Sequence, residues 1–103
     1  MHRIEYLPIA NDDIMQATYY ISHTLCAPQA AENMLEKLDD VIDRIAEFPY
    51  AYELYHTTRP MTGEIRKVPV KGYVLYYAVF EAHVEIRRFL HGHKDRSNLH
   101  LHF

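Results

Sequence analysis

Hydrophobic residues recur at every third or fourth position through the middle of the chain, which is the spacing of an amphipathic helix. The clearest stretch begins at Pro28 and ends before Pro49, with acidic residues between the apolar ones. Proline fits the first position of a helix but not its interior, so the two prolines mark the ends of a helix over residues 28–48. Its apolar face comprises Ala31, Met34, Leu35, Leu38, Val41, Ile42, Ile45 and Phe48.

A weaker helical pattern precedes this helix. Asn11–Asp12–Asp13 follows Pro8 and offers capping and acidic groups, so we expect a helix to begin there. It should end near Leu25, because Ala27-Pro28 starts the next helix. Two helices with so short a connection are expected to form an antiparallel hairpin. The apolar positions of the first helix are Ile14, Ala17, Ile21 and Leu25.

Alternating patterns at both ends of the chain predict strands. His2–Leu7 is a short strand, and Glu64–Val70 is a second one, in which Pro69 indicates a strand end or a sheet edge. Tyr73–Phe80 is apolar on both faces, as expected of a central covered strand. In the last strand Val84, Ile86, Arg88 and Leu90 should share one face, opposite His83, Glu85, Arg87 and Phe89. Lys71-Gly72 and Glu81-Ala82 provide the turns.

The predicted order β-α-α-β-β-β defines an α+β fold, a helical hairpin packed on a small antiparallel sheet. Residues 50–62 form a loop without periodicity, and residues 93–103 are expected to be a short helix or a polar tail. At 103 residues, with 49% hydrophobic and 24% charged residues, the chain is the size of one domain with a single core, spanning residues 1–103.

Composition and charge indicate the cellular compartment and the type of partner. No apolar run is long enough to cross a membrane, and the lone Cys26 cannot form an internal disulfide, which fits a reducing cytoplasm. The net charge of −3 conceals an asymmetry: residues 1–62 carry four Lys/Arg and ten Asp/Glu, whereas residues 63–103 carry seven and four, plus five histidines. Basic charge concentrated in one part of a small domain favours an anionic partner, although a solvated sheet edge has the same composition.

Conventional catalytic motifs are weak. The three glycines occupy turn positions and form no phosphate-binding loop, and neither serine lies in a nucleophile motif. The alternate pairs His91/His93 and His100/His102 are the spacing of metal ligands on an extended segment, but no cysteine accompanies them. We therefore expect neither a metal ion nor another cofactor.

The basic residues of the last strands are the third candidate for a functional site, after the conventional catalytic motifs and the histidine pairs. Guanidinium groups bind phosphate through paired hydrogen bonds, and tyrosine rings stack on bases. The alternative is that these cations form structural ion pairs, for example Arg88 with a helix carboxylate. The expected target-binding residues are Arg66, Lys67, Tyr73, Arg87, Arg88, His91, His93 and Lys94, of which Arg66, Arg88, His91 and Lys94 are also the candidates for catalysis of RNA cleavage.

Essentially the whole chain resembles the RelE/ParE superfamily of toxins from type II toxin–antitoxin systems, the plasmid-stabilisation type. The resemblance rests on IEYLPIANDDI, on a long helix ending in IAEFP, and on EIRKVPVKGYVLYYAVFEAHVEIRRFLHGHKD. Its most specific part is the ending Arg88–Asp95, supported by the spacing of Arg66, Gly72-Tyr73 and Tyr76. It implies a cytoplasmic toxin that arrests growth and is neutralised by a cognate antitoxin protein.

The resemblance leaves two targets open. ParE-like members inhibit DNA gyrase, whereas RelE-like members are metal-independent endonucleases that cleave mRNA on the ribosome. The arginine that such nucleases typically carry in the central strand is replaced here by Val74. Other nuclease members end in a His-Tyr pair, which reads His102-Phe103 here. The basic residue that follows their final strand does have a counterpart in Lys94. Gyrase inhibition is therefore slightly favoured. The alternatives are mRNA cleavage and a RelE-fold binding module without toxicity.

Overall fold

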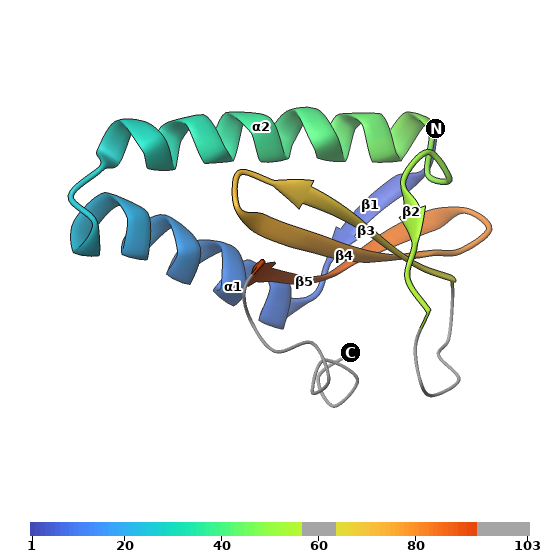
Figure 1. The fold of residues 1–103 in the computed structure, drawn as a ribbon. Helices are drawn as coiled ribbons and strands as arrows, with labels where there is room; N and C mark the ends of the chain where they lie inside the picture. The colour runs from blue at the N-terminus through green and yellow to red at the C-terminus, as the bar shows by residue number, and fades with distance from the viewer. Residues whose placement is uncertain (57–63, 93–103) are drawn as a thin grey trace.

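The computed structural model describes residues 1–56 and 64–92, and in it two helices pack on a five-stranded mixed sheet (Figure 1). The sheet has the strand order β1-β5-β4-β3-β2, so β4 is central. The elements are β1 (Arg3–Tyr6), α1 (Pro8–Tyr19), the π-helical turn η1 (Tyr20–Thr24), α2 (Pro28–Glu47), β2 (Glu53–Leu54), β3 (Glu64–Val70), β4 (Tyr73–Val79) and β5 (His83–His91).

The long helix matches its prediction. Pro28 occupies the first turn of α2, and the helix ends at Glu47, two residues before Pro49. The first helix is different at its start, because α1 begins at Pro8 rather than at Asn11–Asp13. Proline needs no hydrogen-bond partner at a helix start, so it is the first residue of α1 and not a break before it. The helix continues through η1, which ends at Thr24 with Leu25 as its C-cap, as predicted.

The β3–β4–β5 meander is confirmed, and all seven residues of β4 are buried. Lys71 and Gly72 both have positive φ, 48° and 87°, as a two-residue hairpin turn requires. Two features correct the predicted sheet. β1 pairs with β5 in parallel, so the sheet is mixed rather than antiparallel. The expected loop after α2 also contains β2, which adds a two-residue edge strand to β3.

A β-bulge interrupts the last hairpin. Tyr76 pairs with Arg88 and Tyr77 pairs with Ile86, so Arg87 is the additional residue in β5. A one-residue insertion reverses which side chains face each side of a sheet. The predicted common face of β5 is therefore wrong beyond Ile86: Phe89 joins the main core under the helices, and Leu90 lies in a second cluster.

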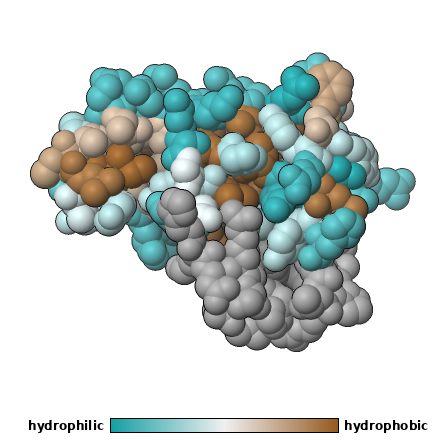
Figure 2. Space-filling model, viewed as in Figure 1, coloured by the Kyte–Doolittle hydropathy of each residue, from teal (hydrophilic) through white to brown (hydrophobic). Residues whose placement is uncertain are grey.

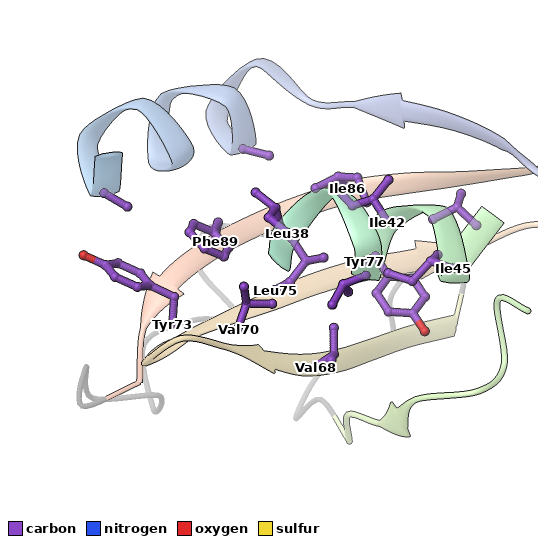
Figure 3. Packing of buried hydrophobic residues seen from close by; sticks show 14 of the residues in the cluster. Leu38, Ile42, Ile45, Val68, Val70, Tyr73, Leu75, Tyr77, Ile86 and Phe89 are labelled. Carbon is purple, nitrogen blue, oxygen red and sulfur yellow. The ribbon is translucent and has the colours of Figure 1, made fainter. Parts of the chain in front are cut away.

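The main core lies between α2 and the sheet, while α1 lies along β5 at the edge of the sheet (Figures 1 and 3). Figure 3 shows Leu38, Ile42 and Ile45 of α2 above Leu75 and Tyr77 of β4. The Tyr77 hydroxyl donates a hydrogen bond to the Pro49 carbonyl oxygen at 2.8 Å, which fastens the end of α2 to the sheet. Within the described ranges, no helix combines the length and the hydrophobicity that a membrane span requires.

We expect Ile45→Ala to lower the free energy of unfolding by about 2–5 kcal/mol, because it removes a fully buried side chain and leaves a cavity. Glu36→Ala, on the exposed face of the same helix, should change it by no more than about 0.5 kcal/mol. Urea denaturation of both variants measures the difference. Equal effects would mean that α2 is not packed on the sheet as described.

Candidate functional site

A buried ion pair joins α1 to the end of β5. Nε and Nη2 of Arg88 donate to Oδ2 and Oδ1 of Asp13 at 2.7 and 3.1 Å, and the Phe89 amide donates to Oδ2 at 3.0 Å. Asp13 is 9% exposed and Arg88 8%. A carboxylate that accepts three hydrogen bonds, two from a guanidinium, is well compensated for its loss of water.

The sheet topology explains this position. β1 ends at Tyr6, opposite Ile86, whereas β5 continues to His91. The Leu7 amide donates to the Ile86 carbonyl oxygen at 3.1 Å, and the chain then turns into α1. Beyond this point α1 lies along the edge of β5, and the Asp13 carboxylate accepts the hydrogen bond of the Phe89 amide that a neighbouring strand would otherwise accept.

Arg88 is largely buried and its charge is paired with Asp13, although part of it lines a groove between α1 and β5, so its role as a target contact or catalytic residue stays a prediction. The structural alternative, an ion pair with a helix carboxylate, is the one observed. Its Nη1 is buried and has no hydrogen-bond partner among the described residues.

Three other predicted contacts also have carboxylate partners. Arg66 lies 2.7 Å from Glu64, and its Nη1 donates to the Tyr52 carbonyl oxygen at 2.6 Å. Lys67 lies 3.5 Å from Glu53, and Arg87 lies 2.9 Å from Glu85. The predicted basic set is therefore not brought together into one cationic surface, because its arginines and Lys67 are distributed among local ion pairs. His93 and Lys94 lie outside the described residues.

Tyr73 and His91 are the predicted residues that the fold does bring together. Their rings meet edge to face with centroids 5.3 Å apart, and the Tyr73 ring also stacks on Phe89 with centroids 5.1 Å apart. Burial raises the pKa of Tyr73, so its hydroxyl is neutral at physiological pH. The pair stands where the end of β5 meets the start of β4.

A groove surrounds this pair, and its two adjoining parts share Tyr20, Tyr73 and His91. The part between α1 and β5 has a volume of about 620 Å³ and contains Asp13 and Arg88 in its wall. The part between η1 and α2 has a volume of about 420 Å³ and an apolar lining. Together, the two parts are lined by Ile9, Asp12, Asp13, Gln16, Ala17, Tyr20, Ile21, Leu25, Ala30, Asn33, Met34, Lys71, Tyr73, Arg88, Phe89, Leu90 and His91.

The rim of the groove exposes apolar surface. Leu25 is 54% exposed and Tyr20 is 45% exposed, although both line the groove. Figure 2 shows hydrophobic surface gathered at this end of the molecule, over the junction of η1 and α2. A concave apolar surface with a few polar groups is the form of a site that binds a peptide segment or a small ligand.

Sequence reasoning missed most of this groove. Asp13 was assigned to a helix cap, although it shares a face with Ala10 and Ala17, both buried. That spacing is the one signal by which its burial could have been found. Leu25 is one of the apolar positions predicted for the first helix, and no sequence pattern indicates Tyr20 as a site residue.

Comparisons with known proteins agree with this fold. A chain from a solved structure, the chromosomal ParDE TA system from P. aeruginosa, superposes with a TM-score of 0.67 at 14% sequence identity, over 88% of this chain and 96% of that one. No curated protein sequence matches the chain. The family model for the ParE toxin of the type II toxin–antitoxin system parDE matches residues 4–96.

The described residues thus define a small α+β domain with a groove beside β5. The chain belongs to the ParE toxin family of type II toxin–antitoxin systems.

Asp13→Asn tests the ion pair. We expect it to lower the free energy of unfolding by about 3–5 kcal/mol, because it leaves the charge of Arg88 buried without a counter-ion. Asp12→Asn, one residue earlier and exposed, is the matched control and should have little effect. Denaturant unfolding followed by circular dichroism gives both values. The double variant Asp13→Leu/Arg88→Met should lose less stability than Asp13→Asn, since it removes both charges.

Proposed function

We propose that this protein is a cytoplasmic toxin that arrests growth by binding and inhibiting DNA gyrase, and that a cognate antitoxin neutralises it. Membership of the ParE toxin family supports the toxin assignment. The observation that carries the choice of target is the buried pairing of Arg88 with Asp13.

Cleavage of RNA without a metal ion requires positive charge that is free to stabilise the pentavalent phosphate. Arg66, Arg87 and Arg88 each have a carboxylate within 2.9 Å, which neutralises much of that charge. The position at which the RelE-like nucleases place a further arginine is Val74, a buried residue of β4. These features favour inhibition by binding over catalysis.

Cleavage of ribosome-bound mRNA is the second candidate. It is favoured by the position of His91, an exposed imidazole against the Tyr73 ring at the groove, where a general base would be accessible to RNA. Under either mechanism His91 is the described residue best placed to contact the target. A non-toxic binding module is the third possibility.

The groove is the proposed site for the antitoxin. Its apolar part lies between two helices and ends at exposed Leu25, which suits apolar side chains at the spacing of an amphipathic helix. Lys71 and His91 also line this part of the groove, and the Lys71 ammonium would attract acidic residues of such a segment.

Induction of the protein in cells that lack the antitoxin tests the target. Gyrase inhibition predicts growth arrest with an SOS response and broken or relaxed DNA, while translation continues at first. Rapid translation arrest with cuts at A-site codons would contradict the gyrase proposal. Normal growth with the folded protein present would instead identify a binding module.

Leu25→Asp tests the antitoxin site. We expect the variant to arrest growth while antitoxin coexpression no longer rescues it, because a charge replaces an apolar contact at the groove rim. Met15→Asp is the matched control, since Met15 is 67% exposed on α1 and does not line the groove. Pull-down of the antitoxin by each variant measures binding directly. Full rescue of Leu25→Asp would exclude this part of the groove.

A further inference from the structure

A cluster of ionisable side chains lies on the sheet face opposite α2, where β1 pairs with β5. Val84 and Ile86 of β5 point into the main core, so His83 and Glu85 lie on the other face. The parallel register places Arg3 beside His83 and Glu5 beside Glu85. None of these residues lines the groove, so this cluster is a separate feature of the molecule.

Three of these side chains offer metal-binding atoms to one another. One donor atom each from Glu5, His83 and Glu85 lie mutually within 4.8 Å. Nε2 of His83 is 3.4 Å from Oε2 of Glu85. That distance is the edge of a tetrahedron whose metal–ligand bonds are about 2.0–2.1 Å long, since such an edge measures roughly 3.3–3.4 Å. The Glu5 donor atom lies within 4.8 Å of the other two, so the partly exposed Glu5 side chain would have to move closer to occupy the third corner.

Neighbouring groups hold these donors in place. Nε and Nη2 of Arg3 both donate to Oε2 of Glu5, at 2.9 and 2.6 Å, so Oε1 of Glu5 accepts neither bond. Arg87 contacts Oε1 of Glu85 at 2.9 Å, while Oε2 of Glu85 faces His83. Each carboxylate thus uses one oxygen for an arginine and has another for the cluster, which is the arrangement by which outer groups orient metal ligands.

The imidazole is oriented as well. The ring of Phe80 stacks on His83 with centroids 4.7 Å apart and an angle of 7° between the planes. The guanidinium of Arg3 favours the ionised form of Glu5 and lowers its pKa, so this ligand is a carboxylate at neutral pH.

We propose that Glu5, His83 and Glu85 form a binding site for one divalent transition-metal ion, with Zn²⁺ as the best match. One imidazole and two carboxylates suit a borderline ion better than Ca²⁺ or Mg²⁺, which prefer oxygen ligands alone. Three protein ligands leave a fourth position for water. The two arginines balance the two glutamates, so the cluster attracts the ion through its donor atoms rather than through net charge.

Binding would connect β1 to β5 and therefore stabilise the folded state. The ligands come from opposite ends of the sequence and come together only after β1 has paired with β5. An ion that binds the folded chain alone raises its apparent stability by mass action. The expected absence of a metal rested on histidine pairs close in sequence, a criterion that does not detect donors brought together by strand pairing.

Titration of the purified full chain with Zn²⁺, and with Co²⁺ as a spectroscopic probe, tests the proposal. The wild-type chain should bind one ion at this site and give the intense visible absorption of low-coordinate Co²⁺. His83→Asn and Glu5→Gln should each weaken binding at least about tenfold and remove this absorption, because each loses a ligand. Glu5 is partly exposed, so Glu5→Gln is expected to fold even if His83→Asn does not.

The histidines of the last eleven residues require a control. The variant His93→Asn/His100→Asn/His102→Asn should retain the binding that His83→Asn loses, and Glu36→Gln on the exposed face of α2 should have no effect. Absence of binding to the wild-type chain would overturn the proposal. Binding that is lost in the triple variant and unchanged in Glu5→Gln would overturn it too, because the ion would then be held by those histidines.

Discussion

The position of α1 depends on one carboxylate. Asp13 accepts two hydrogen bonds from Arg88 and one from the Phe89 amide, at the point where β5 has continued past β1. Isolated, either charge would be unstable in this interior, whereas together they are compensated. Because Asp13, Arg88 and Phe89 also line the groove, the same contact determines the distance between its two walls. Stability and the shape of the proposed antitoxin site are therefore coupled in this family member.

Local patterns predicted the elements that their own residues determine. The apolar stripe and flanking prolines located α2, the uninterrupted apolar run located the buried central strand β4, and Lys71-Gly72 located a turn in which both residues adopt positive φ. The identity of the fold was predictable because these signals occur in the order of a known family, and the family match over residues 4–96 confirms it.

Features that depend on pairing between distant residues were not predictable. Alternation within β5 does not reveal that Arg87 is bulged, because the bulge is defined by the partners Tyr76 and Tyr77 on β4. The parallel orientation of β1 beside β5 likewise depends on the path that the chain takes through α1 and α2. Among the site residues, Tyr73 and His91 were brought together, whereas Arg88 found a carboxylate on α1 that no local pattern associates with it. Arg66 and Arg87 instead pair with glutamates two residues away on their own strands.

The parallel pairing of β1 with β5 also has a consequence for biosynthesis. Arg3 is translated about 80 residues before its strand partner His83. The Asp13–Arg88 contact spans a similar interval. Neither can form on the ribosome until β5 has left the exit tunnel, and contacts so distant in sequence slow folding. A nascent chain therefore lacks the completed groove until β5 has emerged, so an antitoxin that recognises this groove binds only after β5 has joined β1 and α1.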